Sequence, residues 1–398
     1  MKRQLITLII FLIGLSIIRS QTPINANLKE TNFFPGSEPR GLLQIGNDLI
    51  FSANTGSGNE PHKYNLQTGT AAIIQNINGS FTGSMIKDEF YKLNNKAYYF
   101  ASDNSNLQLW STDLSTNLTS KVKDFNIDYY PYSNNMIAKV LNNKLYIILQ
   151  QKLYISDGTT AGTFQINDVY NIENSLLESN GNVFFVGSNN MYGKELWKTD
   201  GTLLGTTIVK DINPGFNSSI GSDKIYKINN KIVFLATANN FSLELWSTDG
   251  TEINTVSFYP LNNGYPIFYD YDVENYNGML FTINGNLWKT DGTFNGTNLI
   301  YNNIPNINKL TYFKDKTYID TNANIYYVDQ ANQVSILNNP SGTILQTIAP
   351  SSNGNYLALK ELGNDTSKLY FFDDTNLLQS NVKFTVDNKF IEYQNKLL

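Results

Sequence analysis

The chain has 398 residues, of which 41% are apolar and only 16% charged, so it can bury a large core and is not a disordered segment. Its net charge is −5 at pH 7, and no basic cluster marks a surface for phosphates, which argues against nucleic-acid binding. Cysteine is absent and His62 is the only histidine, which excludes disulfides, thiolate chemistry and metal sites built from several histidines.

The first residues predict export. Two basic residues precede an apolar run from Leu5 to Ile18, and this order is typical of a secretory signal peptide. We expect residues 1–20 to be the signal peptide and 21–398 to be one mature domain, with an uncleaved anchor as the alternative. Removing the leader leaves 26 basic and 34 acidic residues, a net charge of about −8. No later segment approaches the roughly 20 apolar residues of a spanning helix, so we expect no transmembrane span after cleavage.

One phrase returns along the chain with a period near 44 residues: an aliphatic residue, an aromatic anchor, two further residues and an aspartate. All four tryptophans of the chain are anchors in this phrase. The clear anchors are Trp110, Tyr154, Trp197, Trp246 and Trp288, with weaker copies at Tyr64, Tyr326 and Tyr370. The aspartates that follow the clear anchors are Asp113, Asp157, Asp200, Asp249 and Asp291.

Each copy also contains a turn upstream of the anchor, such as Asn94-Asn95 or Asn180-Gly181, followed by an alternating apolar run. Such pairs tolerate positive φ and are typical of tight β-hairpins. Four short strands in 40 to 45 residues, repeated without a helical period, predict an all-β protein, a β-propeller of seven or eight four-stranded blades. The anchors are expected to fill the space between neighbouring blades.

The ends of the chain bear on how the ring closes. Residues 24–32 resemble the end of a repeat rather than its start, so we expect this N-terminal strand to pair with the last blade and close the ring. Residues 376–398 also offer a final strand or two, which leaves the choice between seven and eight blades open.

The repeated aspartates are interpreted as turn residues. A threonine recurs six residues after each of them, and a carboxylate that accepts bonds from backbone amides across the turn explains both. Calcium is the alternative, but one carboxylate per turn is too few ligands for that ion without help from carbonyls. We therefore predict no cofactor and no metal.

Two aromatic clusters depart from the composition of the other loops and are the binding candidates. Each lies between the last strand of one unit and the first strand of the next. Tyrosine beside aspartate and asparagine suits stacking on sugars or anchoring of a protein, and packing against the inner strands is the alternative. His62 is interpreted as an exposed or half-buried strand residue rather than a catalytic base. The candidate binding residues are Tyr129, Tyr130, Tyr132, Tyr265, Tyr269 and Tyr271.

The phrase Glu195-Leu196-Trp197-Lys198-Thr199-Asp200-Gly201-Thr202, followed by Val-Lys-Asp-Ile-Asn-Pro-Gly at 209–215, resembles the ELWxxDGT repeat family. The resemblance is strongest over 180–300 and covers most of the mature chain more weakly. It implies a propeller-like protein, exported or surface-associated and bacterial. It brings no catalytic residues to carry over.

The sequence thus predicts a non-catalytic propeller that is secreted or lies at the cell surface and binds a protein or glycan there. A secreted hydrolase or lyase acting on polysaccharide is one alternative, and it requires non-repeated carboxylates or arginine at the channel mouth. A structural component of the cell surface is the other, and it predicts self-association. Propellers host many functions, so the fold itself does not choose between these readings.

Overall fold

The computed structural model describes residues 39–79, 82–103, 106–128, 136–173, 175–221, 224–239, 242–261, 266–268, 278–313, 315–321 and 324–337, together with the backbone of strands between 343 and 397. The regular elements in these ranges are β-strands, and none of the described residues forms a helix long and apolar enough to cross a membrane. The described strands make eight four-stranded antiparallel sheets and one two-stranded hairpin. Each four-stranded sheet uses four consecutive strands, and we number these sheets blades 1 to 8 in chain order.

The first four blades span residues 40–208. Blade 1 is β1 (Arg40–Ile45), β2 (Asp48–Asn54), β3 (Asn59–Asn65) and β4 (Thr70–Ile73). Blade 2 is β5 (Met85–Leu93), β6 (Lys96–Ala101), β7 (Asn106–Asp113) and β8 (Leu118–Asp128). Blade 3 is β9 (Ile137–Leu141), β10 (Lys144–Leu149), β11 (Lys152–Ser156) and β12 (Thr163–Gln165). Blade 4 is β13 (Leu177–Ser179), β14 (Asn182–Gly187), β15 (Glu195–Thr199) and β16 (Thr207–Ile208).

The last four blades span residues 225–384. Blade 5 is β17 (Ile225–Ile228), β18 (Lys231–Ala236), β19 (Glu244–Thr248) and β20 (Val256–Pro260). Blade 6 is β21 (Ile267–Phe268), β22 (Met279–Ile283), β23 (Asn286–Thr290) and β24 (Asn298–Tyr301). Blade 7 is β25 (Ile307–Phe313), β26 (Lys316–Thr321), β27 (Ile325–Val328) and β28 (Val334–Leu337). Blade 8 is β29 (Thr343–Ser351), β30 (Gly354–Glu361), β31 (Ser367–Phe372) and β32 (Leu377–Phe384), and the hairpin β33 (Glu392–Tyr393) and β34 (Lys396–Leu397) follows.

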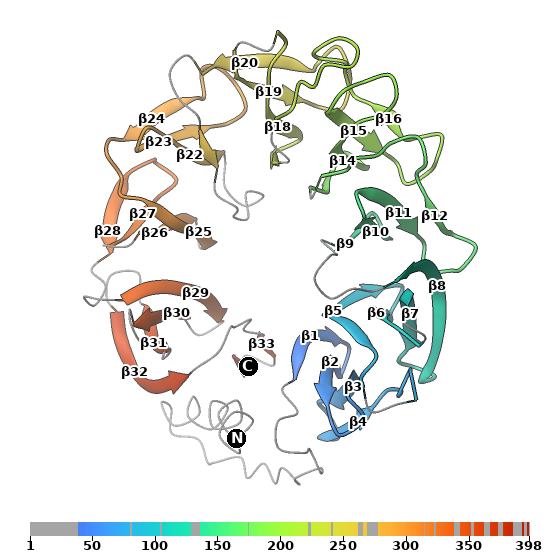
Figure 1. Cartoon of the computed structure of the whole chain (residues 1–398). Helices are drawn as coiled ribbons and strands as arrows, with labels where there is room; N and C mark the ends of the chain where they lie inside the picture. The colour runs from blue at the N-terminus through green and yellow to red at the C-terminus, as the bar shows by residue number, and fades with distance from the viewer. Residues whose placement is uncertain are drawn as a thin grey trace.

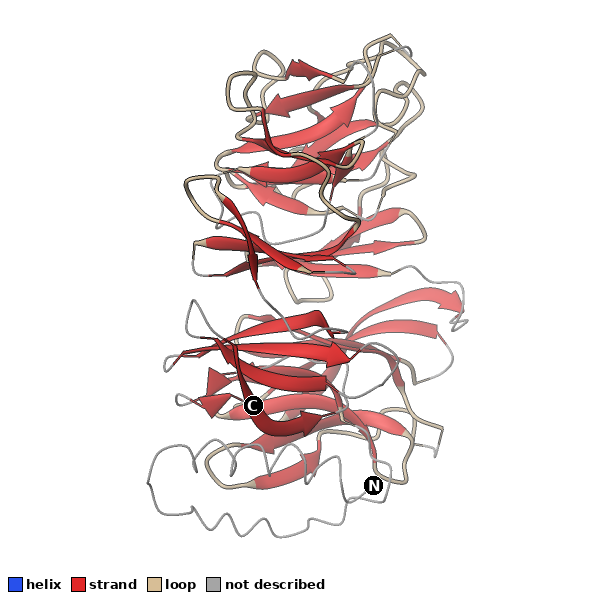
Figure 2. Ribbon diagram, turned by 90° about the vertical axis from the view of Figure 1, so that its left-hand side faces the viewer, coloured by secondary structure: helices blue, strands red, loops and turns tan. Residues whose placement is uncertain are grey.

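The sheets are arranged around a ring, as Figure 1 shows from the direction of the ring axis. This arrangement confirms the predicted β-propeller, and the number of four-stranded sheets selects eight blades. In Figure 2, turned by 90°, most strands run along that axis. Because the strands of a blade alternate in direction, the turns between strands 1 and 2 and between strands 3 and 4 share one face of the ring, which we call the turn face. The remaining loops and the links to the next blade share the opposite face, the connection face.

The turns between the first two strands have the backbone that their sequence predicts. Asn94 and Asn95 have φ of 50° and 61°, Asn142 and Asn143 have 47° and 54°, and Asn180 has 51°. Two successive residues at positive φ match the right-handed twist of the flanking strands. These asparagines therefore set the register of the first hairpin in their blades.

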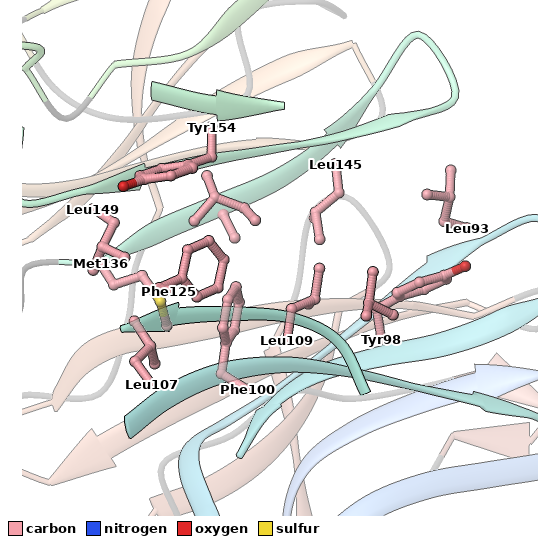
Figure 3. Close-up of a cluster of buried hydrophobic side chains, with 13 residues drawn as sticks. Leu93, Tyr98, Phe100, Leu107, Leu109, Phe125, Met136, Leu145, Leu149 and Tyr154 are labelled. Atoms are coloured by element: carbon pink, nitrogen blue, oxygen red, sulfur yellow. The ribbon is translucent and has the colours of Figure 1, made fainter. Parts of the chain in front are cut away.

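The core is divided into clusters that lie between neighbouring blades. Trp197 of blade 4 is buried in one cluster with Ile148 and Ile155 of blade 3. Figure 3 shows the cluster between blades 2 and 3, where the ring of Phe125 meets that of Tyr154 edge-on at 5.1 Å between centroids. Trp110, Trp246, Trp288 and Tyr326 lie likewise in or against clusters shared with the preceding blade. The anchors of blades 2 to 7 thus join each of these blades to the one before it, because one twisted sheet alone covers only one face of these rings.

The closure of the ring by residues 24–32, like the signal peptide 1–20, concerns residues outside the described ranges and stays a prediction. Blades 1 and 8 each contain four strands from their own stretch of chain. The hairpin β33–β34 contacts β29, the first strand of blade 8. Figure 1 places this hairpin toward the middle of the ring, between blades 8 and 1.

Candidate functional site

The turn between the third and fourth strands has the same hydrogen bonds in several blades. In blade 4, Asp200 Oδ1 accepts from the backbone N–H of Thr202 at 2.9 Å and from its hydroxyl at 2.7 Å. These bonds favour the ionised carboxylate, and the hydroxyl of Thr202 is the main cause that holds the pKa of Asp200 below its usual value. The same pair of bonds, between 2.6 and 3.0 Å, joins Asp113 to Ser115, Asp157 to Thr159, Asp249 to Thr251 and Asp291 to Thr293.

The threonine six residues after the aspartate has a separate role. Thr206 Oγ1 lies 2.7 Å from Thr199 Oγ1 and donates to the carbonyl oxygen of Thr202 at 2.7 Å. A Cβ at Gly205, the residue before it, would lie 2.0 Å from Asp200 Oδ1, so the carboxylate fills the space that a side chain needs. The aspartate therefore explains why glycine precedes this threonine in blades 3, 4 and 6, as Gly162, Gly205 and Gly296. The threonine itself ties the third and fourth strands together.

This turn presents apolar side chains to solvent in three consecutive blades. Leu203 and Leu204 of blade 4 are 56% and 97% exposed, Ile253 of blade 5 is 84% exposed and Phe294 of blade 6 is 62% exposed. Val256 and Leu299, on the outer strands β20 and β24, are exposed as well. We call these six residues the apolar rim; they are half of the large apolar side chains exposed in the described ranges.

Contacts between blades link the three turns of the apolar rim. Lys210, just after β16 of blade 4, donates from Nζ to the carbonyl oxygen of Thr255 in the turn of blade 5 at 2.9 Å. Phe294 in the turn of blade 6 packs on Tyr259 of β20, with 5.7 Å between ring centroids. The turns of blades 5 and 6 are thus each joined to the outer part of the preceding blade.

The strand pairing in blade 1 shows that the anchor predicted there from the repeat spacing, Tyr64, was wrong. Phe51 pairs with His62 in blade 1 as Phe185 pairs with Trp197 in blade 4, so His62 and not Tyr64 occupies the anchor position. His62 is 2% exposed, not exposed or half-buried as expected, and stacks on Phe51. Burial is the main cause that lowers the pKa of its imidazole.

The hydrogen bonds of His62 define its tautomer. Nδ1 lies 2.8 Å from the carbonyl oxygen of Glu60, which can only accept, so Nδ1 carries the proton. Nε2 lies 3.1 Å from Thr55 Oγ1 and accepts from that hydroxyl. Both ring nitrogens are used in the fold, which leaves neither as a base for a substrate.

Two buried glutamates, Glu60 and Glu195, were not predicted from the sequence as site residues. Glu195 is 0% exposed; Ser219 Oγ donates to it, and the N–H groups of Ile212 and Asn213 lie 3.4 and 3.5 Å from its oxygens. Burial is the largest cause that raises the pKa of Glu195, to about 7. We call Glu195 with these three partners the carboxyl clamp of blade 4. The sequence signal for this clamp is the glutamate that stands two residues before the anchor in the repeat phrase. The same position is occupied by Glu60 in blade 1.

The tyrosines predicted to bind lie outside the described residues. These are Tyr129, Tyr130, Tyr132, Tyr265, Tyr269 and Tyr271. In chain order, Tyr129, Tyr130, Tyr132 and Tyr265 follow the fourth strand of a blade, whereas Tyr269 and Tyr271 follow β21, the first strand of blade 6, so the second cluster does not lie wholly between two blades as predicted. That role for the tyrosines stays a prediction.

The described residues hold no group of three or more histidine, aspartate or glutamate side chains placed to bind a metal ion. In the repeated turns, one oxygen of each aspartate already accepts two bonds from the second residue after it. What the turns can do chemically is present apolar side chains on a rigid support. Exposed apolar side chains grouped in this way can contribute contacts to a partner.

No family model matches the chain, and neither does any curated protein sequence. Among solved structures, the tricorn protease is 11% identical with a TM-score of 0.30, over 91% of this chain and 41% of that one. The β-propeller domain of the Trilobed protease from Pyrococcus furiosus is 9% identical with a TM-score of 0.38, over 87% and 99%. AztD from Citrobacter koseri is 9% identical with a TM-score of 0.43, over 86% and 95%. The chain spans less than half of the tricorn protease, and likeness of this degree carries no argument about activity.

Proposed function

We propose that this protein is an exported, non-catalytic β-propeller that binds another protein through the apolar rim on the turn face of blades 4 to 6. Its predicted signal peptide and its resemblance to the ELWxxDGT repeat family support a place outside the cell or at its surface. The exposure of Leu204, Ile253 and Phe294 in the same turn of three consecutive blades carries the proposal.

The physical reason is the cost of exposed apolar surface. Burial of apolar area contributes about 25 cal/mol per Å², or roughly 1.5–3 kcal/mol for a side chain such as leucine that passes from full exposure to full burial. A partner that covers several rim residues gains this contribution repeatedly. The rigid hydrogen-bonded turns lower the entropy that binding has to overcome.

The chemistry of the rim favours a protein over a glycan. Five of its six side chains are aliphatic, whereas sugars are held by flat rings combined with polar groups. The corresponding turn of blade 3 has Thr160 and Ala161 in place of the large apolar residues. The large apolar residues of this turn are therefore not an obligatory part of the repeat.

The test is a binding screen of residues 21–398 against surface proteins and glycans of the source cell. The rim variant carries Leu204→Ser, Ile253→Ser and Phe294→Ser, and a matched control carries Met191→Ser and Phe216→Ser, two exposed apolar residues of the connection face. We expect the rim variant to lose a protein partner at least about tenfold in Kd, since each contact contributes on the order of 1 kcal/mol or more. Binding that survives in the rim variant and disappears in the control contradicts the proposal.

A further inference from the structure

Two blades fasten their outgoing connection to a buried carboxyl group in the same way. In blade 4, the N–H of Ile212 and the hydroxyl of Ser219 donate to Glu195 from 17 and 24 residues further along the chain. In blade 1, the N–H of Ile77, 3.3 Å away, and the hydroxyl of Ser84 donate to Glu60 at the same two spacings. Both glutamates are fully buried in the third strand, at its end on the connection face.

The charges around Glu195 do not compensate an ionised carboxylate. Among the described residues it forms no ion pair. The neighbouring Lys194 pairs its ammonium with Glu173, and Asp211 on the connection adds a second negative charge that raises the pKa of Glu195 further. The three hydrogen-bond donors of the clamp favour the ionised form, but burial without a cation outweighs them, so the pKa of Glu195 is raised.

The clamp controls a defined part of the connection face. The segment from Asp211 to Ser219 carries Phe216, which is 79% exposed. Gly193 donates to the carbonyl oxygen of Gly215 at 3.0 Å, so the loop before β15 rests on the same segment. The N–H groups of Ser219 and Ile220 also donate to the carbonyl oxygen of Lys194 at 3.1 and 3.2 Å, so the segment and this loop are joined at several points.

We propose that the carboxyl clamp of blade 4 is a pH-sensitive fastening, in which protonated Glu195 holds the segment 211–220 against the blade and its ionisation releases that segment. Glu60 forms the corresponding fastening in blade 1. The remaining described blades have a different residue two positions before the anchor, or, in blade 5, a partly exposed Glu244. The release therefore concerns the connections that follow blades 1 and 4.

Hydrogen exchange of residues 21–398 between pH 4.5 and 7.5 tests this. After correction for the intrinsic exchange rate, the opening of the Ile212 and Asn213 amides is expected to rise on the order of hundredfold up to about pH 7. The physical reason is that the opening equilibrium shifts tenfold per pH unit between the pKa of the open and of the closed state. The amide of Val209, which donates to the carbonyl oxygen of Leu196 at 2.9 Å, is the internal reference and shows no such rise.

Two variants separate titration from a merely structural role. Glu195→Gln retains an acceptor oxygen but cannot ionise, so the opening of the segment in this variant is expected to be independent of pH. Ser219→Ala removes a donor that favours the ionised form, so the pH at which the segment opens moves upward. An unchanged pH profile in either variant, or no rise in the parent protein, overturns the proposal.

Discussion

Blades 1 and 4 place different side chains on the same backbone frame. Both bury a glutamate in the third strand, but the anchor is His62 in blade 1 and Trp197 in blade 4. The turn residue is Asn65 in blade 1, whose Oδ1 accepts from the N–H groups of Gln67 and Thr68 at 3.1 and 2.9 Å, where blade 4 has Asp200. The repeat thus preserves positions and hydrogen-bond roles while residue types change.

The largest expected effect distinguishes the true anchors from the apparent one. Trp197→Ala removes a buried indole from the cluster between blades 3 and 4 and should cost about 3–5 kcal/mol in the free energy of unfolding. Tyr64→Ala, at a half-buried position that pairs with Leu49, should cost no more than about 1 kcal/mol. Denaturant unfolding of both variants measures the difference. Equal losses would restore Tyr64 as the anchor of blade 1.

The second prediction concerns the pH dependence of the histidine anchor. His62→Ala should cost about 2 kcal/mol above pH 6.5, because it removes a buried ring with two hydrogen bonds. Since burial lowers the pKa of His62, its contribution is complete above the ordinary value of 6.5 and is lost as the pH falls through the folded-state pKa. The measurement is unfolding of parent and variant from pH 8 to pH 5.

As the only histidine in the chain, His62 also gives a single ring signal for NMR titration. Its midpoint should lie below 6.5. A midpoint at or above that value contradicts the buried position of this ring. So does a difference in the free energy of unfolding between parent and variant that grows toward acid pH.

The third prediction compares the two turn residues. Asp200→Ala and Asn65→Ala should each cost about 1 kcal/mol, because each removes an acceptor for the N–H groups of its turn. Only the aspartate titrates: with its pKa lowered, its contribution is present above the ordinary value of 3.8 and is lost as the pH falls through the folded-state pKa. Unfolding at pH 7 and pH 3 separates the two, and equal sensitivity to acid would show that the charge of Asp200 is irrelevant.

The smallest expected effect is on the apolar rim. Leu204→Ser should change the free energy of unfolding by less than about 0.5 kcal/mol, because this side chain is 97% exposed and leaves no cavity. Leu153→Ala, in the cluster between blades 3 and 4, is the matched control and should cost about 2–5 kcal/mol. Thermal unfolding of both checks this, and a large loss at Leu204 would mean that the rim serves stability rather than binding.

Much of the architecture was predictable because it depends on residues that are close together in the sequence. The Asn94-Asn95 type of turn and the alternating strands after it depend on the conformational preferences of a few adjacent residues, and their recurrence alone indicates blades. The candidate site was less accessible. That Leu203, Leu204, Ile253 and Phe294 are exposed depends on which neighbouring blade covers which turn, and a count of apolar residues does not reveal it.

The sequence by itself determined the period, the all-β class, the tight turns and the Asp-Gly-Thr phrase, because each follows from short-range chemistry repeated along the chain. Only the tertiary structure decided that His62 and not Tyr64 is the anchor of blade 1, and that Glu60 and Glu195 are buried with no ion pair to any residue that the structure describes. Strand register and burial are set by partners that lie one strand or one blade away, and identical phrases acquire different surroundings there.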